Sequence, residues 1–125
     1  MTNANRPSNQ SSIDFPELLS RVDNDRELLV DLLSIFKEDF PRHVRELTEV
    51  ISAHDLKKII VVSHTLKGML ANLAVTRGAS AAAKLEQLAR EAGSESEIAD
   101  AFGAFEREVR SVLPEMEAYM AEVRL

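Results

Sequence analysis

Apolar residues recur with the period of an α-helix along nearly the whole chain from Ile13 onward. The first segment with this pattern is short, Phe15 to Arg21, and Pro16 occupies a position that a first helical turn tolerates. Asp23 or Asn24 can then cap a second, much longer helix. The pattern therefore predicts a short helix that leads directly into a long one.

The long helix keeps its apolar positions in phase over more than twenty residues. These positions are Leu29, Leu32, Leu33, Phe36, Phe40, Val44, Leu47 and Ile51. Pro41 lies inside this run. Because an interior proline removes a backbone hydrogen bond and crowds the preceding turn, we expect a bend near Asp39 to Pro41.

Three further helices follow at short intervals. Asp55 caps the first of them, and Thr76 is a candidate cap for the second, which is rich in alanine and is ended by Gly93. Ser94 opens the last helix, in which Pro114 should again produce a bend. No segment has the alternating pattern of a strand.

Connections of only a few residues make successive helices antiparallel. The expected fold is all-α: an antiparallel up-down four-helix bundle with a short extra N-terminal helix, spanning residues 13–125. Residues 1–12 are polar and are expected to form a disordered tail or linker. One chain supplies all four helices, so we expect a monomer.

Composition narrows the class of partner. The chain has 125 residues and a net charge of −6, so the strongly negative surfaces of nucleic acids and anionic membranes are unfavourable partners. It has no cysteine, which excludes a disulfide scaffold. No run of apolar residues is long enough to span a membrane or to serve as a secretory signal, so we expect a cytoplasmic protein.

Helical geometry predicts where His64 points. At about 100° per residue, His64 lies about 140° from Ile59, which belongs to the apolar arc of its helix. His64 should therefore face solvent. Its neighbours on that side of the helix are Lys57, Val61, Lys67, Gly68 and Ala71.

An exposed imidazole in these surroundings can carry a phosphoryl group. A neutral ring nitrogen is a nucleophile near physiological pH, and Lys67 one turn away can neutralise the added charge. Gly68 costs about 1 kcal/mol relative to alanine inside a helix, which is explained if a larger side chain there would obstruct a partner. Val61 and Ala71 would give that partner an apolar surface. The alternatives are an ordinary solvated face and a glycine that permits close helix packing.

The segment from Ser63 to Val75, SHTLKGMLANLAV, resembles the signature of histidine-containing phosphotransfer (Hpt) domains. The resemblance extends over Phe15 to Phe40 and to the Leu85-Glu86 pair. It implies that the histidine is the phosphoacceptor, with the lysine of the motif beside the phosphoryl group and the glycine keeping the face open. On the third helix of the bundle, Glu86 and Arg90 are candidate neighbours of the imidazole.

The chain departs from the family pattern at four positions. Ala74 replaces the usual turn glycine, which suggests a shifted turn or one that stays helical. Gly78 stands where a core leucine is common, which suggests a looser or later start to the next helix. Leu70 and Met69 are bulkier than usual. We expect Leu70 in the core and Met69 at the border of the docking face.

The resemblance also implies the partners. A response-regulator receiver domain would contribute the aspartyl phosphate, a divalent metal and its own lysine, and a histidine kinase, including a hybrid one, would act upstream. We expect no cofactor or metal on this chain, because His43 and His54 have only Asp39 and Glu46 near them in sequence.

Three other activities can be weighed against phosphotransfer. Thr65 replaces the acidic residue that usually follows the histidine of kinase dimerisation domains, and the chain has no glycine-rich nucleotide loop, so autonomous kinase activity is not expected. An enzyme with its site inside the bundle would need an inward-facing cluster of carboxylates or histidines, and the pattern has none. A helical adaptor that binds a partner without chemistry remains the main alternative.

Overall fold

The computed structural model describes residues 12–123, and every regular element in that range is an α-helix. In chain order the helices are α2 (Phe15–Arg21), α3 (Arg26–Ser52), α4 (Leu56–Asn72), α5 (Thr76–Arg90), α6 (Glu95–Val109) and α7 (Val112–Val123). The predicted disordered tail lies outside the described residues except for Ser12. That residue already belongs to the folded part, because its backbone N–H lies 2.9 Å from a carboxylate oxygen of Glu115.

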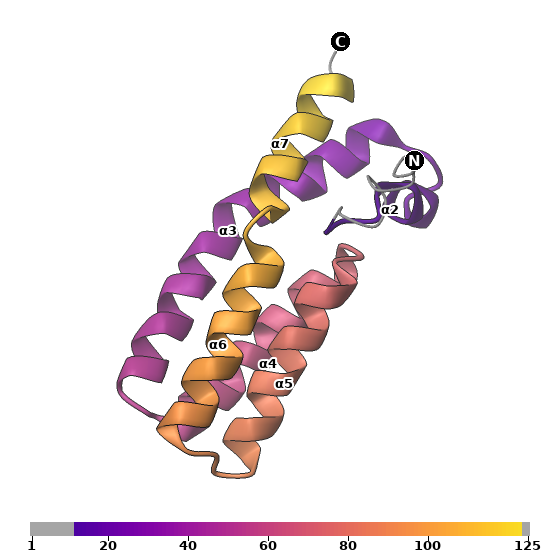
Figure 1. Ribbon diagram of the computed structural model, residues 1–125. Coiled ribbons are helices and arrows are strands. Elements are labelled where there is room, and N and C mark those ends of the chain that lie inside the picture. The colour runs from indigo at the N-terminus through magenta and orange to yellow at the C-terminus, as the bar shows by residue number, and fades with distance from the viewer. Residues whose placement is uncertain (1–11, 124–125) are drawn as a thin grey trace, which may run out of the picture.

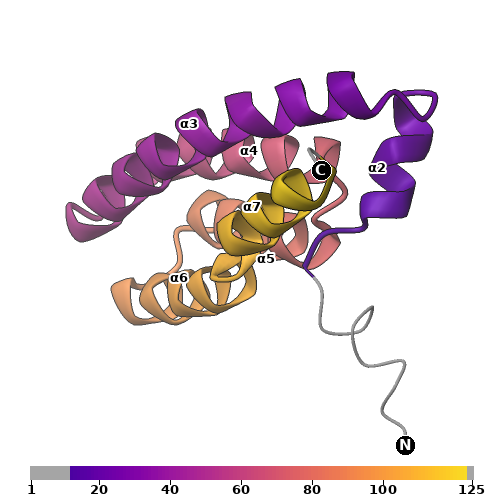
Figure 2. The ribbon, with the colours of Figure 1, turned by 90° about the horizontal axis from the view of Figure 1, so that it is seen from above.

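The helices α3, α4, α5 and α6 run alternately up and down, and α7 continues beyond α6 along α3 (Figure 1). The short helix α2 lies crosswise at the end of the bundle where α3 begins (Figure 2). The prediction of an antiparallel four-helix bundle with a short preceding helix is confirmed. No helix within residues 12–123 is long and apolar enough to cross a bilayer.

Helix starts are set by side-chain caps, in part as expected. Asp55 and Ser94 accept hydrogen bonds from the third residues of their helices, and Ser94 forms a reciprocal capping box with Glu97. The predicted cap of α3 is wrong: it is Asp25, because Asp23 and Asn24 take left-handed conformations in the preceding turn. Thr76 is likewise no cap. It is the first residue of α5, and the capping position is taken by Val75, without a side-chain bond.

The two interior prolines have different effects. Pro41 lies within one continuous helix, and the ribbon of α3 changes direction along its length in Figure 1, as expected for an interior proline. The single bent helix predicted around Pro114 is wrong, because Arg110 and Ser111 separate two helices. Pro114 lacks the N–H that would bond the carbonyl of Arg110, and its ring crowds that carbonyl. This weakens the helix there, and it breaks as α7 packs along α3.

The core is one continuous cluster drawn from all six helices and the loop after α4. Its largest fully buried side chains are Phe105, Leu29, Leu33, Leu47, Ile59, Leu66, Leu70, Leu85, Ile98, Met116, Val75 and Val112. Leu70 is therefore in the core as predicted, and Met69 is half-buried at its edge. The hydroxyl of Ser63 is also buried and donates to the carbonyl of Ile59, which satisfies it locally.

The turns around α5 differ from the expectation. Ala74 has φ of 56°, so the turn after α4 keeps the left-handed residue that glycine usually provides. The prediction of a looser start to α5 is wrong: a Cβ on Gly78 would lie 3.1 Å from both Val75 and Val109, so the absent side chain lets α5 and α6 pack closely. At the other end of α5, Ala92 and not Gly93 takes the left-handed conformation.

Candidate functional site

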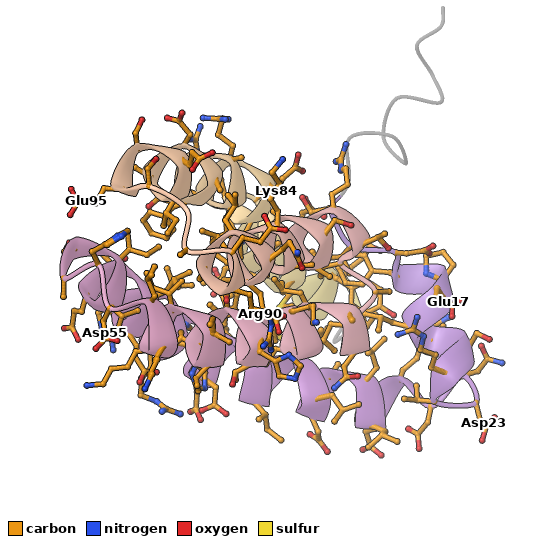
Figure 3. All side chains as sticks on the ribbon, turned by 90° about the horizontal axis from the view of Figure 1, so that it is seen from below. Glu17, Asp23, Asp55, Lys84, Arg90 and Glu95 are labelled. Atoms are coloured by element: carbon orange, nitrogen blue, oxygen red, sulfur yellow. The ribbon has the colours of Figure 1, made fainter. Side chains whose placement is uncertain are left out.

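The site is built on the outer face of α4. Ile59, Leu66 and Leu70 anchor the buried side of this helix, and the turn geometry of an α-helix then points His64 away from the core. The side chain of His64 is 63% exposed. The predicted orientation of the imidazole is confirmed. Figure 3 shows this side of the molecule, with Arg90 labelled.

A carboxylate from the neighbouring helix holds the imidazole from behind. Glu86 of α5 is 8% exposed, and its Oε2 lies 3.1 Å from Nδ1 of His64. Its other oxygen, Oε1, lies 2.9 Å from Nζ of Lys67. Arg90 donates to Oε2 through Nη2 at 2.8 Å. These four side chains, His64, Lys67, Glu86 and Arg90, are called the Glu86 cluster below.

The cluster keeps Glu86 ionised. Burial alone would raise the pKa of this carboxyl group. Hydrogen bonds from Lys67, Arg90 and His64 outweigh burial and lower its pKa to about 2. At neutral pH the buried carboxylate is therefore charged, and its charge is offset by the two cations beside it.

An ionised carboxylate can only accept hydrogen bonds, so Nδ1 of His64 must be the donor in their contact. In the neutral imidazole the proton is then on Nδ1, and Nε2 carries the free lone pair. Because Glu86 reaches the ring from the buried side, the geometry leaves Nε2 for a reactant from outside. The chemistry that this arrangement favours is nucleophilic attack by Nε2.

Gly68 keeps the space beside the imidazole open. A Cβ placed on Gly68 would meet no heavy atom within 4 Å. The alternative explanation, that this glycine permits close helix packing, is therefore excluded. Val61 is 64% exposed, and Lys57 and Ala71 are also exposed, so the face predicted around His64 exists as expected.

The two candidate neighbours on α5 have different contacts. Glu86 touches the imidazole directly, whereas Arg90 donates to the carboxylate of Glu86. Lys67, expected beside a phosphoryl group, pairs with the same carboxylate while its side chain stays partly exposed. In the sequence, Glu86 was indicated only by the Leu85-Glu86 pair of the family resemblance. Spacing within one helix cannot reveal a contact between two helices.

Two features of this side of the molecule were not singled out from the sequence. Arg21 of α2 donates to the carbonyl oxygens of Ala71 and Asn72 and so caps the C-terminus of α4. A row of large apolar side chains on α3 is exposed: Leu28, Leu32 and Ile35. Of these, only Leu32 was predicted among the apolar positions of the long helix, and it lies outside the buried row. The sequence could have indicated this row, because Leu28, Leu32 and Ile35 are four and three residues apart and so share one side of a helix.

The remaining histidines form no site of this kind. Nδ1 of His43 lies 3.7 Å from a carboxylate oxygen of Glu46, which makes an ordinary pair one turn apart on α3. Within residues 12–123, no three histidine, aspartate or glutamate side chains converge as metal ligands would. The expectation of a metal-free chain stays a prediction.

Two solved structures illustrate the likeness in fold. Histidine-containing phosphotransfer protein B from Pseudomonas aeruginosa PAO1 superposes with a TM-score of 0.80 at 22% identity, covering 90% of this chain and 97% of that one. The HPT domain of an Hpt sensor hybrid histidine kinase from Shewanella superposes with a TM-score of 0.78 at 12% identity, covering 89% of this chain and 95% of that one. These identities establish a shared fold.

The sequence itself carries the family assignment. No curated protein matches the chain. The pattern that defines the Hpt domain matches residues 31–124, which include every side chain of the Glu86 cluster. The chain therefore belongs to the Hpt domain family.

Proposed function

We propose that Nε2 of His64 accepts a phosphoryl group from the aspartyl phosphate of a receiver domain and passes it to another receiver or back. Hpt domains are phosphotransfer intermediates of two-component signalling, which sets the reaction class. The observation that carries the assignment to His64 is its exposed ring, held at Nδ1 by a buried, ionised carboxylate.

Transfer of the phosphoryl group to Nε2 requires no proton transfer. The Nε2–P bond forms as the acyl P–O bond of the aspartyl phosphate breaks, and the receiver's carboxylate leaves with the bonding electron pair. The ring keeps its proton on Nδ1 and becomes positively charged when Nε2 is phosphorylated. Oε2 of Glu86 lies 3.1 Å from Nδ1, which carries that proton, so the negative charge of Glu86 stabilises the product ring.

The cations of the cluster serve both states of the carrier. Before transfer, Lys67 and Arg90 neutralise Glu86. After transfer, the new phosphoryl oxygens lie beside the imidazole, and the partly exposed ammonium group of Lys67 is one helical turn away. Lys67 is the group that would pair with the phosphoryl group.

The receiver supplies the rest of the chemistry. Phosphoryl transfer needs in-line geometry and charge neutralisation, and the receiver's divalent metal and lysine would provide both at the aspartyl phosphate. This chain would then need no metal, no bound nucleotide and no kinase activity of its own. We place it as a cytoplasmic monomer that takes part in a relay started by a histidine kinase.

The adaptor alternative has less support. An adaptor requires neither a charged carboxylate buried behind an exposed imidazole nor a helix glycine that faces empty space. The glycine also weakens its helix, a cost for which an adaptor offers no reason. A phosphoryl carrier uses both features.

Transfer from a panel of radiolabelled phosphorylated receivers tests the proposal. We expect acid-labile label on the wild-type chain and none on the His64→Gln variant. His43→Gln is the matched control, because it removes a histidine of α3 outside the site, and it should be labelled as the wild type is. Labelling of His64→Gln at the wild-type level would refute the assignment.

A further inference from the structure

Three large apolar side chains form an exposed row on the N-terminal half of α3. Leu28 is 43% exposed, Leu32 is 38% exposed and Ile35 is 57% exposed. Their spacing of four and three residues places them along one side of the helix. Single exposed apolar residues are ordinary, whereas a continuous row is typical of a contact surface. We call Leu28, Leu32 and Ile35 the α3 stripe.

The α3 stripe lies on the side of α3 that faces α4. At about 100° per residue, it is about 100° around the helix from the fully buried Leu29 and Leu33. The helix α7 is contacted by Ser34 and Lys37. These two residues also lie about 100° from Leu29 and Leu33, but on the opposite side of them from the stripe. Since α3 packs its long sides against α7 and α4, the stripe borders the α4 side.

The α3 stripe is close enough to His64 for one receiver to contact both. His54 lies in the turn between α3 and α4, and both His64 and Val44 are ten residues from it, so these two lie level along the antiparallel pair. Ile35 is nine residues, or about 14 Å, further along α3. An interface of about 800 Å² per partner is about 32 Å across if it is round. Leu32 and Leu28 are about 18 and 24 Å further along α3 than the level of His64. An interface of this width therefore covers both His64 and the stripe when it is centred between them.

The charged side chains beside the stripe differ in sign from those around the imidazole. Exposed acidic side chains follow the stripe on its outward side, about 80° around α3: Glu27, Asp31 and Glu38. The region around the imidazole is basic, with Lys57, Lys67 and Arg90. The region around the imidazole is thus basic, and the α3 surface farther away is apolar with an acidic border.

We propose that the α3 stripe and its acidic border select the receiver. The partner that fits is a receiver domain whose contact helix presents apolar side chains bordered by lysine or arginine. This inference rests on the proposed function. Every receiver brings an acidic phosphorylation centre to His64, so the basic region suits all of them alike. Only the α3 surface, away from the reacting atoms, distinguishes one receiver from another through charge complementarity.

The double variant Asp31→Lys/Glu38→Lys tests the charge term. Its matched control, Asp100→Lys/Glu106→Lys, makes the same charge change at exposed positions of α6, which packs against α5. Initial transfer rates are measured against the concentration of each phosphorylated receiver, at low and at high salt. For the receiver that the wild type prefers, we expect kcat/KM to fall at least tenfold at low salt and the maximal rate to stay within twofold. For the control variant, both kcat/KM and the maximal rate should stay within twofold of the wild-type values.

A second variant tests the apolar term and covers the case in which the first does not fold. Leu32→Asn replaces an exposed side chain, and we expect it to lower kcat/KM about fivefold for the preferred receiver at an unchanged maximal rate. Circular dichroism and thermal unfolding verify that each variant is folded. Wild-type kcat/KM and receiver preference in the folded variants would overturn the inference.

Chemical phosphorylation separates this inference from the proposed function. Phosphoramidate, a small phosphoryl donor, can reach Nε2 without a docked receiver. We expect both variants to be labelled by it at the wild-type rate. If neither phosphoramidate nor any receiver labels His64 in the wild type, the proposed function fails. If the wild type is labelled and the variants keep its receiver preference, only the selection role fails.

Discussion

In the proposed transfer, Glu86 is the residue that fixes the ring proton of the exposed imidazole. Its carboxylate accepts from Nδ1 of His64 and is held by Lys67 and Arg90. It acts as a positioning residue, since it contacts the ring on the side away from the incoming phosphorus. A carboxylate fixes the ring proton and offsets the charge of the phosphorylated ring, whereas an amide of the same shape can do neither fully.

Replacing Glu86 by glutamine should therefore slow transfer without weakening docking. A hydrogen bond to a charged partner exceeds a neutral one by about 1 kcal/mol, which corresponds to about a fivefold change in rate. We expect Glu86→Gln to lower the maximal transfer rate about fivefold at an unchanged KM for the receiver. Glu91→Gln, at the exposed position that follows α5, should leave both constants unchanged. An equal rate for Glu86→Gln would refute the positioning role.

The same carboxylate links stability to pH. The pKa of Glu86 is about 2 in the folded protein, below its ordinary value of 4.5. Its contribution to folding is then fully present above pH 4.5 and is lost as the pH falls toward 2. In urea titrations, Glu86→Gln should lose less stability than the wild type between pH 5 and about pH 2.5. Parallel pH profiles for the two proteins would contradict this.

At the scale of the helix, α4 is less stable than its length allows. Gly68 faces open space, and glycine in a helix costs about 1 kcal/mol relative to alanine. We expect Gly68→Ala to raise the melting temperature by about 4 °C. Gly68→Leu should fold as well as the wild type but lower transfer from receivers at least tenfold, while phosphoramidate still labels His64. Wild-type transfer by Gly68→Leu would show that the open space is not needed.

The turns at the two ends of α5 provide a comparison between similar alanines. Ala74 and Ala92 both have φ of 56°, which disfavours any side chain. Ala92 is exposed, so we expect Ala92→Gly to stabilise the fold by about 0.5–1 kcal/mol. Ala74 is 6% exposed, and removing its packed methyl group should reduce or cancel that gain. Urea unfolding measures both variants, and a loss of stability in Ala92→Gly would contradict the argument.

At the scale of the whole molecule, the two ends of the described chain are joined. The carboxylate of Glu115 in α7 accepts hydrogen bonds from the backbone N–H groups of Ser12 and Ile13, and from the hydroxyl of Ser111. The contacts of Ser12 and Ile13 with Glu115 connect residues about one hundred positions apart. They hold the segment before α2 against the start of α7, on residues outside the Glu86 cluster.

Removing this contact should weaken the fold and leave the chemistry intact. We expect Glu115→Ala to lower the free energy of unfolding by about 2 kcal/mol, because hydrogen bonds to a charged group contribute about 1.5–3 kcal/mol. Transfer to and from receivers should match the wild type at a temperature where the variant is folded. Glu117→Ala, which removes a half-exposed carboxylate of the same helix, should change stability by less than about 1 kcal/mol.

Properties that depend on one helix at a time could be predicted from the sequence. The period of apolar residues determined the helical class, and the polar residues before each run predicted the caps Asp55 and Ser94. The outward direction of His64 followed from its angular distance to Ile59, because the geometry of a single helix is the same wherever the helix packs. The break near Pro114 was predicted only as a bend, since the outcome depended on how α7 packs on α3.

Only the tertiary structure decided what the helices bring to one another. The contact between Glu86 and His64 depends on the register of α5 against α4, and the exposure of the α3 stripe depends on where α4 and α2 end beside it. Such registers are set by side chains of several helices packing together, and no local spacing encodes them. The chain's sequence thus determined a helix with an outward histidine, and packing supplied the carboxylate behind it.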